Sequence, residues 1–440
     1  MKAAAFRFLG AGYDDGAARL RYAFDDGPEL VETLRFPAPP PLPADRAGAF
    51  AAALRLLHLV AGISYYKAAV PPGIEVAGEP LDTATAAMLD EIYTEGLGEF
   101  ALQNDLDLRG RVRFPHSGRT VPAAVPLDLP RRSLLPVGGG KDSLVSLELL
   151  RGAGEPLTPV WVGRSALIAA CVQASGLDGL NIERELSPLL FEMNRQGALN
   201  GHIPVTAINS AILVVAALLY GYDAIVFSNE RSASAPTLER DGRAVNHQWS
   251  KGLRFESLLR EHLAQRVTPS LDYFSLLRPL SELAVTARFA ALDRYFEVFS
   301  SCNRNFRILG TRPTSRWCGQ CPKCHFVFLA LAPFLPKPRL TAIFGRNLLD
   351  DEALIPAFEA LMAFRADKPF ECVGEADESR AALHALSVRA EWREDAVVAH
   401  YRRRVLPAIG GEGLELEALM APAGAHHLPP RLAGLFDEAR

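Results

Sequence analysis

Three consecutive glycines followed by a lysine, an aspartate and a serine, residues 138–143, are the stretch of this sequence that most directly indicates chemistry. An apolar run, 134–137, precedes the glycines, and a segment with helical spacing follows them. Glycines at a helix start let backbone N–H groups converge on an anion, and the helix dipole adds positive charge there. The pattern predicts a strand, a phosphate loop and a helix, with Lys141 as a mobile charge and Asp142 as a candidate Mg²⁺ ligand.

Two common phosphate loops do not match this stretch. The Walker loop requires a glycine six residues before its Lys-Ser/Thr pair, where this chain has Leu135, and here Asp142 follows the lysine. The dinucleotide fingerprint requires a third spaced glycine, and Ser143 occupies that position. A glycine-rich turn without a ligand is the alternative, but glycines with Lys-Asp-Ser at one helix start favour phosphate binding.

Four of the six cysteines have the spacing of a metal site. They are Cys302, Cys318, Cys321 and Cys324. Four thiolates suit a structural Zn²⁺, which would hold a loop without taking part in the reaction. An iron–sulfur cluster is the alternative, and zinc is favoured because nothing else in the sequence indicates electron transfer. The other two, Cys171 and Cys372, have no partner nearby in the sequence, and we interpret them as core residues.

A second polar loop follows the strand candidate 224–228. Its candidate residues are Ser228, Asn229, Glu230 and Arg231. In parallel sheets, ligands bind beyond the carboxyl ends of the strands, so this loop is expected beside the glycine loop. A solvated surface loop is the alternative. Three further polar residues, His202, His247 and Lys251, are weaker candidates for the same site.

The elements that would position these groups alternate between strand and helix after residue 132. The strand candidates are 134–137, 159–162, 181–186 and 224–228, and the clearest helix is 207–219. This alternation is typical of an α/β fold with a parallel sheet covered by helices. Upstream, residues 3–36 are expected to form a small antiparallel meander, followed by helices at about 45–60 and 83–93.

Composition shifts divide the chain into four expected regions. They are an N-terminal α+β domain (1–120), a proline-rich linker (121–132), a nucleotide domain with the cysteine cluster (133–330) and a helical C-terminal region (331–440). In the last region, 348–365 and 380–406 have amphipathic spacing and are predicted to be helices.

The composition excludes several classes of protein. The 440 residues are 49% apolar and 22% charged, as in ordinary globular proteins. A net charge of −4 gives no general attraction to nucleic acid or anionic lipid. The apolar run 211–221 is far shorter than the ~20 residues of a membrane span. Bunched cysteines indicate a reducing compartment, so we expect a cytoplasmic protein without nucleic-acid or membrane partners.

Eight segments together resemble the UDP-N-acetylmuramoyl-L-alanyl-L-glutamate epimerases of bacterial peptidoglycan synthesis. They are 61–67, 96–100, 137–143, 201–206, 228–234, 247–251, 317–324 and 369–375. The glycine loop by itself is similar to the Ser-Gly-Gly-x-Asp-Ser loop (PP-loop) of the ATP pyrophosphatases, with Gly138 in place of the first serine. That likeness implies a PP-loop nucleotide domain of the adenine nucleotide alpha-hydrolase type.

The resemblance implies an activity. A member of this family would use ATP and Mg²⁺ to invert the terminal L-glutamate of UDP-N-acetylmuramoyl-L-Ala-L-Glu, releasing AMP and diphosphate. Transfer of AMP to the glutamyl carboxylate would remove its charge. Removal of the neighbouring Cα proton would then give an enolate-like species that a polar site can stabilise. Functional coupling to the ligase that adds L-glutamate is also implied.

The resemblance also suggests roles for the candidate residues. Gly138, Gly139, Gly140 and Ser143 would bind the phosphates, Lys141 would stabilise the departing diphosphate, and Asp142 would bind Mg²⁺. The loop residues Ser228, Asn229, Glu230 and Arg231 would line the nucleotide or substrate site. The candidates for proton transfer, by their chemistry alone, are His202, Glu230, His247 and Lys251.

Two other functions remain open from the sequence. A different adenylating enzyme, such as an amide- or nitrile-forming relative of the 7-cyano-7-deazaguanine synthases, would share the glycine loop and the cysteines but would consume ammonia. A zinc-stabilised nucleotide sensor would bind ATP without releasing diphosphate.

Overall fold

A mostly parallel sheet forms the centre of the computed structural model, which describes residues 2–118, 121–240, 243–307 and 311–436. Within these residues, nine strands join in the order β11-β8-β5-β6-β7-β3-β2-β1-β4. The first five are β11 (Asp272–Ser275), β8 (Ala224–Phe227), β5 (Ser133–Pro136), β6 (Leu157–Val162) and β7 (Leu180–Glu185). Each pairs in parallel with its neighbour, which confirms the four predicted strands and the α/β class, while β11 was not predicted.

The N-terminal meander continues the same sheet. Its strands are β1 (Ala5–Asp14), β2 (Ala17–Phe24) and β3 (Leu30–Arg35), with β4 (Gly73–Val76) parallel to β1 at the edge. Strand β3 pairs antiparallel with β7, and buried Glu32 accepts from Arg184 Nε at 2.7 Å across this junction. The meander is therefore as predicted, while the domain boundaries near residue 120 stay a prediction. Residues 1, 119–120, 241–242, 308–310 and 437–440 of the predicted regions lie outside the described residues.

Two apolar helices fill the core of the N-terminal half. Helix α1 (Ala47–Ala61) packs on β1 and on α8 (Val205–Tyr220), and α3 (Thr83–Gly96) lies beside α1. Among the described residues, one segment, Ala44–Tyr66, is long and apolar enough to span a membrane. Because 67% of its most apolar window is buried, we interpret this segment as a core helix.

The C-terminal half is helical but more broken than its pattern predicts. The predicted helix 380–406 is interrupted: α14 (Ala376–Ser387) ends, and α15 (Ala396–His400) begins after Asp395. The carboxylate of Asp395 bonds Lys337 Nζ at 2.5 Å and Asn347 Nδ2 at 2.7 Å, which fixes the break. Likewise, the predicted helix 348–365 contains two short turns and then α13 (Ile355–Leu361).

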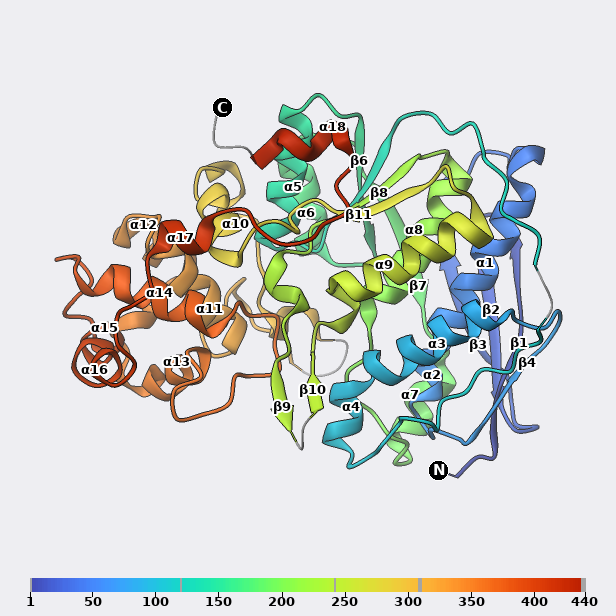
Figure 1. Cartoon of the computed structure of the whole chain (residues 1–440), viewed down its shortest axis with the longest axis horizontal. Helices are drawn as coiled ribbons and strands as arrows, with labels where there is room; N and C mark the ends of the chain where they lie inside the picture. Colours follow the sequence, from blue (N-terminus) through green and yellow to red (C-terminus); the bar gives the residue numbers. More distant parts are fainter. Residues whose placement is uncertain (1, 119–120, 241–242, 308–310, 437–440) are drawn as a thin grey trace.

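The remaining elements complete the arrangement in Figure 1, where the N-terminal strands and the C-terminal helices lie at opposite ends. The helices are α2 (Ile63–Tyr66), α4 (Gly98–Gln103), α5 (Lys141–Gly152), α6 (Ala166–Ser175), α7 (Pro188–Arg195), α9 (Leu253–His262), α10 (Glu282–Phe289), α11 (Pro322–Leu331), α12 (Lys337–Phe344), α16 (Leu406–Ile409), α17 (Leu416–Met420) and α18 (Pro430–Ala433). Strands β9 (Leu238–Arg240) and β10 (Arg243–Val245) pair antiparallel in a separate small sheet.

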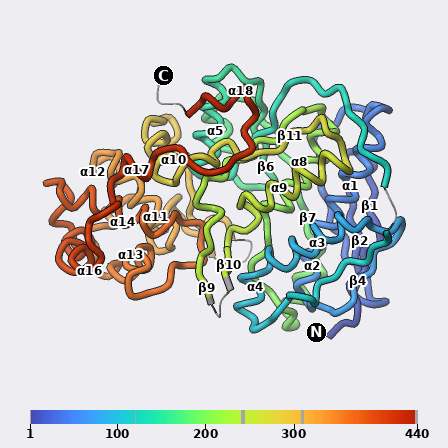
Figure 2. Tube along the Cα trace, in the orientation of Figure 1, coloured from blue at the N-terminus to red at the C-terminus, as the bar shows by residue number. Residues whose placement is uncertain are grey.

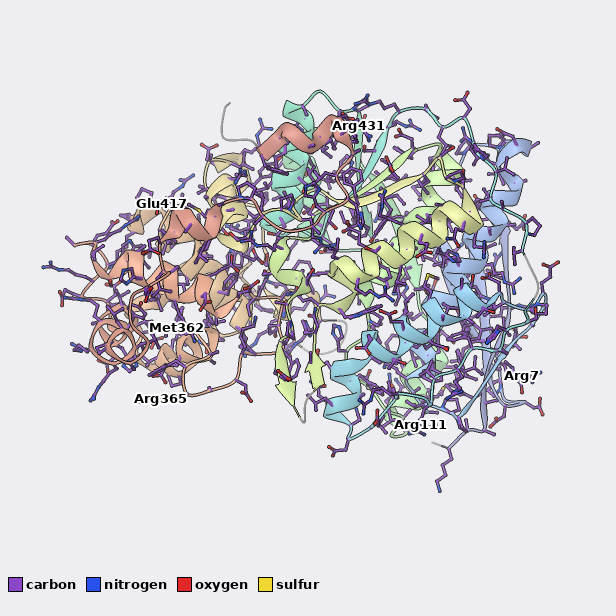
Figure 3. All side chains as sticks on the ribbon, viewed as in Figure 1. Arg7, Arg111, Met362, Arg365, Glu417 and Arg431 are labelled. Carbon is purple, nitrogen blue, oxygen red and sulfur yellow. The ribbon has the colours of Figure 1, made fainter. Side chains whose placement is uncertain are left out.

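The end of the chain returns to the sheet. Figure 2 shows the trace running from α17 across the molecule to α18, which lies near α5. Arg431 of α18, labelled in Figure 3, reaches Glu155 Oε2 at 3.7 Å and Asp272 Oδ2 at 3.7 Å. The C-terminal segment therefore links the helical end to the edge of the sheet at β11.

Candidate active site

The glycine loop has the predicted strand–loop–helix geometry. It connects β5 to α5, and Gly139 adopts a φ of +83°, which L side chains rarely adopt. A Cβ built on Gly140 would lie 2.6 Å from Ser301 Oγ, so a larger residue there would displace the Ser301 side chain. The hydroxyl of Ser143 accepts from the Gly138 N–H at 3.4 Å and donates to the Gly140 carbonyl at 3.2 Å. Ser143 therefore closes the loop on itself.

Lys141 lies buried at the start of α5 between two carboxylates. Its Nζ contacts Asp142 and, from α10, Glu282. Burial opposes the charge of Lys141, but the two carboxylates outweigh it and raise the pKa of the ammonium group. The pKa of Asp142 is lowered: burial opposes this, and Lys141 and Lys323 favour it. The sequence did not indicate Glu282, which lies 141 residues after Lys141.

The carboxyl ends of three adjacent strands supply this site. After β5 come the glycine loop and Lys141, after β8 comes the loop with Ser228 and Asn229, and after β11 comes α10. Asn229 Nδ2 donates to Ser275 Oγ at the end of β11 at 3.0 Å, which ties two of the strand ends together. Ser228 Oγ is buried and has no hydrogen-bond partner among the described residues, so it is free to bind a ligand.

Glu230 and Arg231, adjacent in sequence, lie in different surroundings. The buried carboxylate of Glu230 accepts from the Ala233 N–H and the Ser232 hydroxyl, each at 3.1 Å. Burial, reinforced by Glu282, raises the pKa of Glu230 to about 7. The Arg231 guanidinium instead donates to backbone carbonyls of the C-terminal segment, at residues 419 and 421. Glu230, and not the Arg231 guanidinium, is therefore the group that is electrostatically coupled to Asp142 and Glu282.

The pKa of Glu230 gives a first testable prediction. In the folded protein the pKa of Glu230 is about 7, against an ordinary value of 4.5. The folded state therefore binds this proton more tightly than the unfolded state, and the free energy of unfolding falls as the pH rises from 4.5 to about 7. We expect Glu230→Gln, which does not titrate, to gain up to about 3 kcal/mol in unfolding free energy relative to the wild type between pH 4.5 and 8. Urea unfolding at four pH values measures this, with exposed Glu412→Gln as the control for losing one carboxylate. A constant difference across pH would contradict the prediction.

Glu99, His202 and His247 form a second polar group. Glu99 comes from α4, which begins beside β10, since a Cβ on Gly98 would lie 3.7 Å from Val245. Oε2 of Glu99 contacts Nδ1 of His247 and lies 3.7 Å from Nδ1 of His202. The two imidazole rings are 4.4 Å apart between centroids. Three chain segments therefore converge on one carboxylate.

The two histidines hold different charges. Burial opposes protonation of His247, but hydrogen bonds with Cys372 and Glu99 raise its pKa to about 9. Burial and the neighbouring His247 lower the pKa of His202 to about 4. The donor atoms of Glu99 and the two histidines lie within 4.8 Å of one another. The raised pKa of His247 and its contact with Glu99 make these two residues an ion pair.

Cys372 is only half-buried, so the interpretation of this cysteine as a core residue is wrong. Its half-buried sulfur lies 3.2 Å from Lys251 Nζ, and Lys323 Nζ donates to its carbonyl oxygen. The partner lysine Lys251 is 121 residues away, so local spacing gave no sign of it. The one indication in the sequence that Cys372 could be functional is that it lies in 369–375, one of the eight segments that resemble the epimerase family. Cys171, by contrast, is fully buried, as expected of a core residue.

The four clustered cysteines come together as the spacing predicts. The sulfur of Cys321 lies 3.4 Å from that of Cys324 and 4.0 Å from that of Cys302, and Cys318 lies 3.7 Å from Cys324. All four sulfur atoms lie within 4.8 Å of one another, which fits one tetrahedral metal ion. The cluster precedes and begins α11, and it places Lys323 with its Nζ 3.9 Å from Glu282 Oε1.

Comparisons with known proteins place the chain in a family. The family model described as the MurL N-terminal domain matches residues 1–276, and the one described as the MurL C-terminal domain matches residues 298–412. The chain belongs to the MurL family. This confirms the resemblance that the eight segments indicated, while the PP-loop assignment of the nucleotide domain stays a prediction.

Curated MurL relatives match almost the full chain. The chain is 56% identical to a relative from Xanthomonas oryzae pv. oryzae over 430 residues, which is 97% of this chain and 95% of the relative. It is 46% identical to one from a Micromonospora species over 92% of this chain and 89% of the relative. It is 44% identical to one from Salinispora tropica over 98% and 94%. Each relative is named a UDP-N-acetyl-alpha-D-muramoyl-L-alanyl-L-glutamate epimerase.

Proposed function

We propose that this chain is an isomerase that converts the terminal L-glutamate of UDP-N-acetylmuramoyl-L-Ala-L-Glu to D-glutamate in peptidoglycan synthesis. The observation that carries this proposal is 56% identity, over 97% of the chain, to a relative named for that substrate and reaction. The substrate is the product of a ligase that adds L-glutamate, so the two enzymes act in sequence. Because such nucleotide-linked precursors are intracellular, we place the reaction in the cytoplasm.

We infer that ATP activates the glutamyl carboxylate before the centre inverts. A Cα proton beside an ionised carboxylate is hard to remove, because the carbanion would add negative charge to negative charge. Transfer of AMP to the carboxylate, with release of diphosphate, makes the group ester-like, and an enolate can then form. After the centre is reprotonated, water hydrolyses the acyl–phosphate bond, which releases AMP and restores the carboxylate. The glycine loop supports this step, since it offers backbone N–H groups and a lysine at a helix start.

The chain's own residues have distinct parts in this activation. The loop 138–140 would bind phosphate oxygens through its N–H groups, and Ser143 holds the loop in shape. Lys141 would stabilise the negative charge that collects on the departing diphosphate. The carboxylates of Asp142 and Glu282 fit Mg²⁺, a cation that prefers oxygen ligands, and the bound ion would supply charge neutralisation for the phosphates. Ser228 Oγ, buried and unpaired among the described residues, would orient the nucleotide.

We infer that the cysteine cluster holds a structural Zn²⁺. Four sulfur ligands leave no open position for substrate, which is the arrangement of structural rather than catalytic zinc sites. The four thiolates would fix the start of α11 and, with it, Lys323 beside Glu282. The cluster would therefore order the start of α11, which lies beside the carboxylate of Glu282.

Product analysis tests the proposed function. Purified protein is incubated with ATP, Mg²⁺ and UDP-N-acetylmuramoyl-L-Ala-L-Glu; diphosphate is then measured, and glutamate enantiomers are separated after acid hydrolysis. We expect D-glutamate to form together with AMP and diphosphate, and neither ammonia nor amide to be involved. Ammonia-dependent amide formation would instead support the other adenylating class. ATP binding without diphosphate release would support the sensor.

A further inference from the structure

The sulfur of Cys372 lies where two charged groups meet. Lys251 Nζ is 3.2 Å from it, and His247 is near enough for its positive charge to lower the pKa of this thiol. His247 in turn contacts Glu99 through Nδ1. A lysine in contact with the thiol and an imidazole–carboxylate pair nearby are groups that can hold a cysteine as the thiolate, the form that acts as a nucleophile or base.

The location of this series matches the location of the activating machinery. Lys251, which touches the sulfur, contributes to the low pKa of Asp142 in the lysine–carboxylate cluster at the glycine loop. Lys323, which touches the Cys372 carbonyl, reaches Glu282 of the same cluster at 3.9 Å. The sulfur and the groups around Lys141 are therefore connected through two shared lysines.

We propose that the Cys372 sulfur is the base that exchanges the Cα proton of the glutamyl residue, with His247 and Lys251 holding it as a thiolate. This inference rests on the proposed function and deepens it, because it names one of the groups that inverts the centre. Glu99 acts through His247 and Lys251 acts through the sulfur, so both are positioning residues.

The proton balance of the step is complete. In the L-to-D direction, the Cα–H bond breaks, an S–H bond forms, and the electron pair enters the enolate of the adenylated carboxyl group. A protonated acid on the opposite face then forms the new Cα–H bond, and the electron pair returns to carbon. The sulfur gives its proton to water, and the acid regains one, so no oxidant or other co-reactant is consumed.

The charges around the sulfur support this role. Burial raises the pKa of the Cys372 thiol, but Lys251, His247 and Lys323 outweigh burial and lower it to about 6. The adjacent carboxyl group of Glu371 opposes this effect only when ionised, and burial raises its pKa to about 7. The thiolate therefore predominates at neutral pH, which a base requires.

Cys171 shows the contrast with a structural thiol in the same chain. It is fully buried, its sulfur donates to the Gly139 and Val298 carbonyls at 3.6 Å, and burial raises its pKa to about 12. No cation touches its sulfur among the contacts that the described residues make. The lysine and histidine at Cys372 are thus a specific feature of that site.

Two partial reactions separate the base from the rest of the machinery. Isotope exchange between diphosphate and ATP reports adenylation, and formation of D-glutamate reports inversion. We expect Cys372→Ser and Cys372→Ala to keep the substrate-dependent isotope exchange within about threefold, and to lose inversion by about 10²–10⁴-fold. Thermal melting and metal content establish that each variant is folded.

The outcomes are distinct. Inversion at the wild-type rate in both variants would overturn the proposal, and so would loss of both reactions in folded variants, because Cys372 would then act before proton removal. If the wild-type chain itself performs neither reaction, the proposed function fails, and that result appears without any variant.

Alkylation tests the positioning residues by a signal other than activity. Native protein is treated with iodoacetamide from pH 5 to 9, and modification of Cys372 and Cys171 is followed by peptide mass spectrometry. We expect Cys372 to react with a midpoint near pH 6 and Cys171 not to react. Lys251→Met and Glu99→Gln should move the Cys372 midpoint upward by about one pH unit or more, since each weakens the positive charge at the sulfur. An unmoved midpoint in Lys251→Met, or a wild-type midpoint near 8.5, would overturn the proposal.

Discussion

Replacing Lys141 with methionine is expected to lower diphosphate release and epimerisation together, each by about 10³-fold or more. The ammonium group is buried at the head of α5, where the glycine loop would bring the phosphates. Methionine keeps most of the volume but removes the charge that would stabilise the departing diphosphate. It also leaves Asp142 and Glu282 without the cation between them, so phosphate binding is weakened by repulsion. Initial rates of diphosphate release and D-glutamate formation measure the effect.

The matched control for this substitution is Lys337→Met. Lys337 also forms a half-buried ion pair, with Asp395 at 2.5 Å, but lies on α12 in the C-terminal helices. We expect this control to lower the melting temperature slightly and to leave both rates within about twofold. Epimerisation by folded Lys141→Met at a tenth of the wild-type rate or more would contradict the assigned role of the loop lysine.

Replacing Cys324 with serine is expected to release the metal and inactivate the enzyme. Four sulfur ligands hold the start of α11, so losing one lowers the affinity for the ion and loosens this helix end. Lys323 then loses its position beside Glu282 and the Cys372 carbonyl. We expect the variant to hold well under one metal ion per chain, to melt several degrees lower and to lose about 10²-fold or more in epimerisation.

Elemental analysis and melting curves measure this effect, with Cys171→Ser as the matched control. Cys171 is an equally buried thiol outside the cluster, so its variant should keep the full metal content. One zinc per wild-type chain is the expected result. Iron together with acid-labile sulfide would instead support the iron–sulfur alternative. Full metal content in Cys324→Ser would contradict the four-thiolate site.

Elements with a local signal could be predicted from the sequence. The strands of the parallel sheet are short apolar runs in the sequence, because both of their faces are buried. The strands of the meander alternate between apolar and polar residues, because one face is buried and the other is not. The break at 388–395 could not be predicted, because the amphipathic spacing continues through it. What interrupts the helix is the tie from Asp395 to Lys337 and Asn347, 58 and 48 residues away in the chain.

The site divides in the same way. The glycine loop and the cysteine cluster were predictable because their groups are neighbours in the sequence, with spacings that carry the chemistry. Glu99, Glu282 and Cys372 were not, because each reaches the site through a partner more than 100 residues away. For Cys372 this separation led to a wrong interpretation, since a lone cysteine is most often a core residue.

The most direct test of this account is whether removal of the Cα proton requires cleavage of ATP. Wild-type protein, Mg²⁺ and UDP-N-acetylmuramoyl-L-Ala-L-Glu are followed in D₂O by ¹H NMR at the glutamyl Cα signal. One sample contains ATP, and the other contains an ATP analogue with a non-cleavable α,β-methylene bridge. We predict that deuterium enters Cα only with ATP, at a rate that diphosphate release matches or exceeds. Equal deuterium entry with the analogue would contradict activation of the carboxylate as the step that makes inversion possible.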